Sequence, residues 1–262
     1  MNDFPLADLH VHLLADLDDG PRTWDDALAM CRIAVAEGVT HTVALAHQSE
    51  RWNLSPETIR EAVVELRRRL AAELIPLEVF PAAEVMAVPD LADAWSAGRV
   101  LSVGDRGQFL LVEMPHQLFV DLGPVVHRLA TRGVRIILAH PERHAELLHE
   151  PGRLEELIRL GCLVQVSSGS LTEPANIANE KALKAWVRRG CVHLLGSDGH
   201  SPRSRKPLMA AAADRIREWA GPETAERICA ATGRAILSGI PVEVPTPTSA
   251  RKWWPARLLG AN

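Results

Sequence analysis

Tyrosine is absent from this chain of 262 residues, and phenylalanine and cysteine occur only four times each. None of the cysteines forms a C-x-x-C pair, which argues against a disulfide framework or a zinc knuckle. Their scatter through apolar or helical surroundings is typical of buried thiols in a reducing compartment. A C-x5-R motif is also missing, because the nearest approach, "CAATGR" from Cys229, is one residue short. A cysteine nucleophile that depends on this spacing is therefore not expected.

Long apolar runs and an excess of basic charge are missing as well. No run approaches the roughly 20 residues needed to span a bilayer. The net charge is -4, with both signs interspersed, so nucleic acid is not an expected partner. The first residues, "MNDFPLADLH", lack the basic and apolar regions of a secretory signal, so we expect a cytoplasmic protein. No G-x-G-x-x-G follows the first expected strand, which leaves a nucleotide-binding fold without support.

Short apolar runs alternate with longer helical patterns along most of the chain. Seven runs are predicted to be strands: "PLADLHVHLL", "THTVALAH", "LEVFPAAE", "FLLVEMP", "VRIILAHP", "CLVQVSSGS" and "VHLLGSDGH". Thr23, and Ser55 followed by Pro56, mark the starts of two helices between them. This alternation predicts a parallel sheet covered by helices, either a barrel or a doubly wound sheet. We expect one α/β domain over residues 1–240 and an extended tail over residues 241–262.

Six of the seven predicted strands end in residue types that bind metal ions. In strand order, these residues are His10 and His12, His47, Glu84, Glu113, His140, and Asp198 with His200. The sixth strand ends instead in Ser167 and Ser168. The carboxyl ends of the strands of a parallel barrel converge on one face, and residues two apart on a strand point to the same side. Without cations the gathered carboxylates would repel one another, so we predict more than one ion of the Mn, Fe or Zn type.

The loop after the first strand, "LLADLDDG", contributes further acids. We predict that Asp19 is another metal ligand, and that Asp16 and Asp18 are turn residues. Asp8 is expected to orient one imidazole without binding a metal ion itself. A lone H-x-H pair is more often structural or incidental. The predicted metal site therefore depends on the coincidence of ligand types at the strand ends.

Two arginines closely follow predicted ligands. Arg143 lies three residues after His140 in "HPER", and Arg205 lies five after His200 in "SDGHSPRSR". A guanidinium group binds phosphate oxygens bidentately and stabilises developing negative charge, so both are candidate catalytic residues. The alternative is that they are surface arginines of loops, and Arg203 is a weaker candidate in the same loop.

Taken together, "DLHVH", "DDGP", "HPER" and "SDGH" resemble the PHP superfamily. More closely, they resemble the bacterial manganese-dependent tyrosine phosphatases of capsule and exopolysaccharide operons (the CpsB/YwqE type), over about residues 6–240. The resemblance implies a distorted (β/α)7 barrel, the PHP fold, in a single domain. It implies two to three Mn²⁺ ions as the cofactor, with Fe or Zn as alternatives. It also implies a phosphotyrosine protein as the partner, in particular the tail of a bacterial tyrosine kinase.

The resemblance further assigns the ligands to three metal positions. The first is held by His10, His12, Glu84 and Asp198; the second by Glu84, Glu113 and His140; the third by Asp19, His47 and His200. Arg143 and Arg205 match the family's phosphate-contacting arginines. The chain departs from the family pattern at Gln48, where the family has a second histidine, and at His144, where it has a tyrosine. Both departures are expected at the mouth of the site.

The reaction expected from these features is phosphomonoester hydrolysis, in which a metal-bound hydroxide attacks phosphorus. The resemblance implies a protein-tyrosine phosphatase that regulates capsule or exopolysaccharide synthesis. Three alternatives stay open: a PHP phosphatase for a small ester such as histidinol phosphate, a TatD-like or amidohydrolase-type hydrolase, and a non-catalytic phosphotyrosine-binding regulator. In the tail, "RKWWPARLL" sets Trp253 and Trp254 among basic residues, so this segment is the one that offers contact with a membrane or a docking partner.

Overall fold

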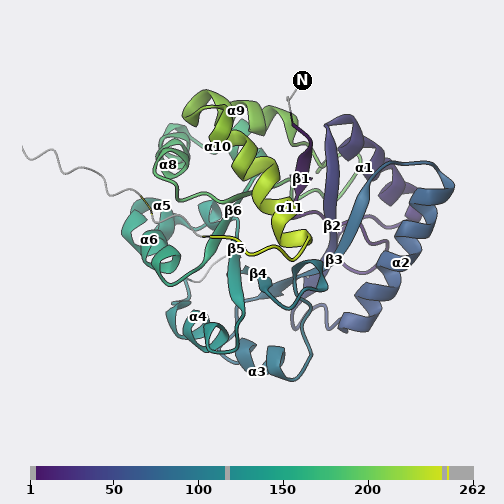
Figure 1. Cartoon of the computed structure of the whole chain (residues 1–262), viewed down its shortest axis with the longest axis horizontal. Helices are drawn as coiled ribbons and strands as arrows, with labels where there is room; N and C mark the ends of the chain where they lie inside the picture. Colours follow the sequence, from purple (N-terminus) through teal and green to yellow (C-terminus); the bar gives the residue numbers. More distant parts are fainter. Residues whose placement is uncertain (1–3, 116–118, 244–246, 248–262) are drawn as a thin grey trace, which may run out of the picture.

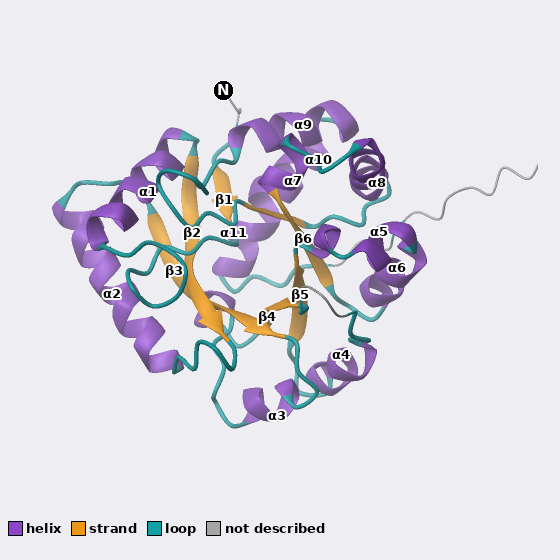
Figure 2. Ribbon diagram, turned by 180° about the vertical axis from the view of Figure 1, so that it is seen from behind, coloured by secondary structure: helices purple, strands orange, loops and turns teal. Residues whose placement is uncertain are grey.

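The computed structural model describes residues 4–115, 119–243 and 247, and this part of the chain contains one seven-stranded parallel sheet. Its strands are β1 (Leu6–Asp8), β2 (Val39–Gln48), β3 (Glu78–Met86), β4 (Phe109–Glu113), β5 (Arg135–Ala139), β6 (Leu163–Ser167) and β7 (Leu194–Gly196). Strands that follow one another in sequence are neighbours throughout. Beyond β1 and β7 the ring closes, because Val11 bridges Gly199 and the Asp198 amide donates to the His10 carbonyl at 2.7 Å. The predicted (β/α)7 barrel is confirmed (Figures 1 and 2).

Helices connect the strands and surround the ring (Figure 2). They are α1 (Trp24–Ala36), α2 (Pro56–Ala72), α3 (Leu91–Ser96), α4 (Gly123–Ala130), α5 (Ala145–His149), α6 (Pro151–Arg159), α7 (Ser168–Thr172), α8 (Ile177–Arg188), α9 (Ala210–Ala220), α10 (Pro222–Glu226) and α11 (Thr232–Leu237). Two predicted helix starts are confirmed, because Thr23 Oγ1 accepts from the Asp26 amide at 3.2 Å and Ser55 Oγ accepts from the Thr58 amide at 3.1 Å.

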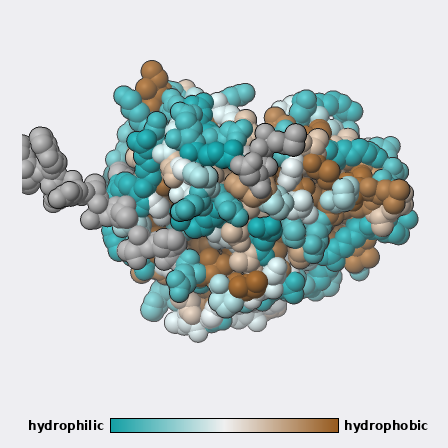
Figure 3. All heavy atoms as spheres, turned by 45° about the horizontal axis from the view of Figure 1, so that its top comes forward, coloured by the Kyte–Doolittle hydropathy of each residue, from teal (hydrophilic) through white to brown (hydrophobic). Residues whose placement is uncertain are grey.

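The described helices include none with the length and apolar character needed to cross a bilayer. Figure 3 shows a face on which hydrophilic side chains are interspersed with hydrophobic ones.

Two hydrophobic clusters hold the barrel together, one between the strands and the helices and one inside the ring. Both exist because successive residues of a strand face opposite sides of the sheet. The inner cluster includes Leu9 and Leu111 and is completed by Ile236 and Leu237 of α11, which lies across the ring in Figure 1. A Cβ atom on Gly233 would lie 2.4 Å from Leu9 Cδ2, so a larger residue there would force the Leu9 side chain to move away from α11. The amino end of the barrel is thereby filled with apolar side chains, which leaves the carboxyl end for polar ones.

The first predicted strand is shorter in the structure than its apolar run. Regular pairing stops at Asp8, and the chain beyond it makes single bridges, from Val11 to Gly199 and from His12 to Leu45.

After the last helix the chain remains in contact with the barrel, because Arg135 Nη1 donates to the Val242 carbonyl at 2.8 Å. The predictions for the tryptophan-containing tail concern positions outside the described residues.

Candidate metal centre

The nine predicted ligands all meet at the carboxyl ends of the strands. They form four overlapping groups in which the donor atoms lie within 4.8 Å of one another. The groups are His12, Asp19, His47 and His200; His10, His12 and Asp198; His10, Glu84 and His140; and His47, Glu84 and Glu113. The strands supply eight of these residues at or just beyond their ends, and the loop before α1 supplies Asp19. The side chains predicted from strand ends therefore do converge.

Glu84 lies at the centre of this arrangement, with imidazoles on several sides. Its Oε2 is 3.2 Å from His10 Nε2, 3.3 Å from His12 Nε2 and 3.2 Å from His47 Nδ1. Its Oε1 is 3.0 Å from His140 Nε2. Two ligands bound at right angles to one ion at about 2.1 Å are about 3 Å apart, so these spacings fit donors that share cations. The mixture of imidazole and carboxylate donors fits Mn, Fe or Zn.

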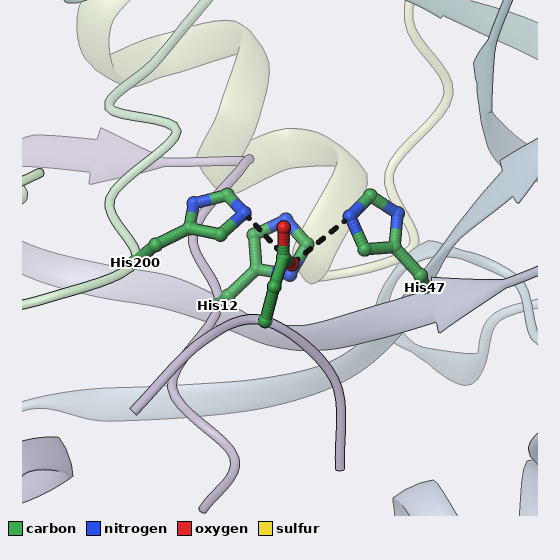
Figure 4. Close-up of side chains that lie close together, drawn as sticks. His12, His47 and His200 are labelled. Carbon is green, nitrogen blue, oxygen red and sulfur yellow. Dashed lines mark ion pairs between the residues drawn. The ribbon is translucent and has the colours of Figure 1, made fainter. Parts of the chain in front are cut away.

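A second carboxylate joins the outer part of the centre. Asp19 Oδ1 lies 3.3 Å from both His47 Nε2 and His200 Nε2. Figure 4 shows the rings of His12, His47 and His200 gathered around a carboxylate, with dashed lines to two of them. The Asp19 side chain is 45% exposed, whereas Glu84 is almost fully buried. Asp19 is therefore the most exposed of the nine side chains.

The ionisable groups of the centre perturb one another strongly. Burial and the nearby Glu84 carboxylate raise the pKa of Glu113 to about 7. Burial lowers the pKa of His140 to about 4. Burial also disfavours the imidazolium of His12, but the carboxylates of Asp18 and Glu84 outweigh it and raise the pKa of His12 to about 10. The raised pKa values of Glu113 and His12 favour protonated side chains near neutral pH. A metal ion that binds these side chains would therefore have to displace their protons.

Asp18 lies in the turn, as predicted, but it is more than a turn residue. Its side chain is fully buried, with 0% exposed, and its Oδ2 lies 2.6 Å from His12 Nδ1. The same oxygen accepts from the His47 amide at 2.9 Å, and Oδ1 accepts from the Gly20 amide at 2.9 Å. Asp18 therefore orients one predicted ligand and the backbone of another. Asp16, which is exposed with φ 59°, is a turn residue as predicted.

Asp8 does not orient an imidazole, so that prediction is wrong. Its Oδ1 accepts from the backbone amides of His10 at 3.1 Å and Ser197 at 2.9 Å, which ties β1 to the end of β7. The imidazole of His10 is held instead by Gln165 of β6, whose Oε1 lies 2.9 Å from Nδ1. The sixth strand thus contributes to the centre by an amide that sequence reasoning overlooked.

Trp52 is a second overlooked neighbour of the centre. Its ring stacks on that of His47, with centroids 4.7 Å apart and planes at 15°, and the Arg51 guanidinium lies 4.2 Å from the centroid of the Trp52 ring. The pattern of metal-binding residue types could not reveal an aromatic contact of this kind.

The two predicted arginines both contact Asp198, one of the predicted ligands. Arg143, from the turn after β5, and Arg205, from the loop after β7, each donate through Nη2 to Asp198 Oδ2, the latter at 2.8 Å. Arg143 also donates to Ser167 Oγ at 3.3 Å. Arg203 is 80% exposed and pairs with Asp26 at 3.3 Å, so the structure favours Arg205 over it.

Gln48 and His144, which were predicted at the mouth, are both buried. The Gln48 amide donates to the Leu54 carbonyl at 2.8 Å, and its Oε1 accepts from the Leu101 amide at 2.9 Å. His144 is only 3% exposed. The amide of Gln48 is therefore used by the backbone of the neighbouring loops.

The four cysteines are all buried and unbridged, as predicted. Burial raises the pKa values of Cys31 and Cys162 to about 12. None of the four groups of metal-binding side chains contains a cysteine. The chemistry of the centre is thus that of carboxylates, imidazoles and guanidinium groups.

Comparisons with known proteins agree with this geometry. The family described as "Capsular polysaccharide synthesis, CpsB/CapC" matches residues 6–238. The tyrosine-protein phosphatase YwqE of Bacillus subtilis is 32% identical over 213 residues, which cover 76% of this chain and 79% of YwqE. The tyrosine-protein phosphatase CpsB of Streptococcus pneumoniae is 24% identical over 238 residues, 88% of this chain and 98% of CpsB.

A crystal structure from work on B. subtilis YwqE and S. pneumoniae CpsB, described there as unique metal-dependent tyrosine phosphatases, superposes with a TM-score of 0.85. The identity is 26%, and the match covers 94% of this chain and 100% of that one. The match along nearly the whole barrel, together with the ligands at its strand ends, shows that this chain belongs to the CpsB/CapC family.

Proposed function

We propose that this chain is a metal-dependent protein-tyrosine phosphatase that acts in capsule or exopolysaccharide synthesis. One observation carries the proposal. Arg143 and Arg205 both donate hydrogen bonds to Asp198, which belongs to a cluster of nine residues of metal-binding types. The activity named for YwqE and CpsB supports the substrate class. The partner that fits this role is a phosphotyrosine protein of the cytoplasm, such as the tail of a bacterial tyrosine kinase.

The metal ligands in this proposal are the nine converging residues: His10, His12, Asp19, His47, Glu84, Glu113, His140, Asp198 and His200. Glu84 belongs to two of the four groups, which suits a carboxylate shared by two ions. We propose two to three ions, Mn²⁺ in the first place, with Fe or Zn as alternatives. Such ions supply Lewis acidity, which makes water nucleophilic at neutral pH.

The chain itself supplies the charge that a phosphate ester needs. Arg143 and Arg205 approach Asp198 from separate loops, so their guanidinium groups lie at the edge of the ligand cluster. There they bind phosphoryl oxygens and neutralise negative charge that grows as the ester bond breaks. An amidohydrolase has no dianionic substrate that would use two such groups. The proposed role of both arginines is therefore specific to phosphate chemistry.

The test is a comparison of substrates on metal-stripped and reloaded protein. The reloaded protein should hydrolyse p-nitrophenyl phosphate and a phosphotyrosine peptide, and favour the peptide over histidinol phosphate. Elemental analysis should give two to three transition-metal equivalents, and chelation should abolish turnover. A stoichiometry below one after loading refutes the multinuclear centre. Preference for histidinol phosphate would replace the protein substrate by a small ester, and binding of the peptide without turnover would indicate a regulator.

A further inference from the structure

A groove runs away from one side of the proposed active site. It encloses about 1150 Å³ and is continuous with the centre, because Arg143, Asp198 and Arg205 line it at one end. Pockets of roughly 300–1000 Å³ hold whole drug-sized ligands, so the space exceeds what a phosphoryl group needs. A second hollow, beside Asp19 and His200, shares Arg203 and Arg205 with the groove but is much smaller, about 250 Å³. The surroundings of the centre are therefore asymmetric.

The two walls of the groove differ in chemistry. One wall is residues 203–206 of the loop after β7, which supply the exposed side chains of Arg203, Arg205 and Lys206. Among the described residues, no carboxylate forms an ion pair with Lys206, and Arg203 is paired only with Asp26, at 3.3 Å. Arg205 donates to Asp198 at 2.8 Å, so Lys206 and the largely exposed Arg203 are the cations of this wall that are accessible to a negatively charged ligand.

The opposite wall comes from α7 and the start of α8, which lie on the same side of the barrel as α5 and α9 (Figure 2). It presents hydroxyl and amide groups, from Ser170, Thr172 and Asn179. Such groups both donate and accept hydrogen bonds, as the backbone of an extended peptide requires. Of the acids that line the groove, Glu142 faces inward and accepts from the Ser167 amide at 2.8 Å. Glu173 is the exposed acid of this wall.

We propose that this groove binds the polypeptide on one side of the phosphorylated residue and selects acidic side chains there. The inference rests on the proposed phosphatase function and adds a sequence preference to it. The volume of the groove accommodates several residues of a peptide. Its basic wall favours negatively charged side chains of that peptide, and its hydroxyl and amide groups can hydrogen-bond the peptide backbone. Because the groove lies on one side of the centre only, the preference is one-sided.

Three phosphotyrosine peptides of equal length test the proposal. The first has three glutamates before the phosphotyrosine and glutamines after it, the second has the reverse arrangement, and the third has glutamines on both sides. One glutamate peptide should have a kcat/KM roughly three- to tenfold above that of the glutamine peptide, mainly through KM, as expected for a few exposed charge pairs. The other should resemble the glutamine peptide. Added salt should remove the advantage.

Charge reversal in the groove supplies the second arm. Lys206→Glu and Arg203→Glu should each abolish the advantage of the favoured glutamate peptide. Each should also raise kcat/KM for a fourth peptide, in which lysines replace the three glutamates of the favoured peptide. Lys181→Glu is the matched control, because Lys181 is an exposed lysine of α8 outside the groove lining. It changes the net charge equally and should leave the preference in place. The ratio of peptide to p-nitrophenyl phosphate turnover in each variant separates peptide binding from effects on the centre.

The results of these assays separate peptide binding in the groove from the proposed phosphatase activity. If p-nitrophenyl phosphate is hydrolysed but all three peptides react equally, the groove is not a peptide site and the phosphatase proposal stands. Equal gains for both glutamate peptides, or equal losses in Lys181→Glu and Lys206→Glu, would reveal a general charge effect and overturn the one-sided groove. If no phosphate ester is hydrolysed by the reloaded enzyme, both proposals fail.

Discussion

Replacing Asp18 by asparagine tests whether a residue outside the ligand set controls the metal centre. The carboxylate receives three hydrogen bonds, from His12 Nδ1 and the His47 amide through one oxygen and from the Gly20 amide through the other. The asparagine amide has one oxygen and one NH2 group. If its oxygen serves His12 and His47, its NH2 faces the Gly20 N–H, donor against donor. If it is turned round, the His47 N–H loses its acceptor, and His12 must carry its proton on Nε2, the atom that faces Glu84.

The size of the effect follows from either arrangement. A hydrogen bond to a charged group contributes about 1.5–3 kcal/mol, and a buried donor without an acceptor costs about 1–3 kcal/mol. Loss of a partner that orients a metal ligand typically costs about 10- to 100-fold in metal affinity, or about 1.4–2.8 kcal/mol. We therefore expect Asp18→Asn to weaken Mn²⁺ binding by about 10- to 100-fold while the barrel stays folded.

The assay is a competition between the protein and a chelator of known affinity, with thermal unfolding as a check on the fold. Asp16→Asn is the matched control, because Asp16 is exposed and its positive φ of 59° suits asparagine equally well. It removes the same charge from the same loop and should bind metal as the natural chain does. Equal metal affinities in the two variants would refute the reasoning, since the carboxylate of Asp18 would then have no special role.

Three further predictions concern the centre itself. Glu84→Gln, which keeps the volume of the side chain, should remove at least one metal equivalent and nearly all activity, as elemental analysis and turnover would show; near-normal turnover would mean that Glu84 is not shared between ions. Arg143→Ala and Arg205→Ala should each lower kcat/KM by about 10²-fold at unchanged metal content, with only partial rescue by lysine; wild-type kinetics in both would make them surface residues. Metal binding at pH 7 should release protons, because the raised pKa values of Glu113, about 7, and His12, about 10, keep protons on groups that must lose them to become ligands. Metal affinity should accordingly fall as the pH drops below 7, and calorimetry in two buffers of different ionisation enthalpy checks the release; a heat independent of the buffer would contradict it.

The sequence sufficed to predict the strand-end part of the centre, since it follows from a regular geometry. Parallel strands bring their carboxyl ends to one face, so His47, Glu84 and His140 could be placed together without knowing any loop. The pairs His10 with His12 and Asp198 with His200 also reach this face, but not as a period of two in extended chain, because β1 ends at Asp8, β7 ends at Gly196 and Asp198 has a positive φ of 54°.

What the sequence could not reveal lies in loops and in side chains without a distinctive metal chemistry. Asp18 is the clearest case: the sequence places it in the same acidic loop as Asp16 and Asp19, and only the path of that loop buries its carboxylate behind His12. Gln165 reads as an ordinary polar residue of a strand until the closed barrel places it against His10. Likewise, Gln48 is the last residue of β2, next to His47, but its side-chain amide forms hydrogen bonds with the backbone of Leu54 and Leu101.

The closure of the barrel has a consequence for how the protein is made. The first strand is joined to the last by Asp8 and Ser197 and by the bridge from Val11 to Gly199, so residues from both ends of the chain complete the centre. During synthesis on the ribosome, His10 and His12 emerge almost at once, whereas their neighbour Asp198 follows nearly two hundred residues later. A nascent chain can therefore form helices and pair its first strands, but it cannot assemble the complete set of metal ligands. The groups that include Asp198 or His200 can therefore form only once nearly the whole barrel has been synthesised, whereas the group of His47, Glu84 and Glu113 lies wholly in the first half of the chain.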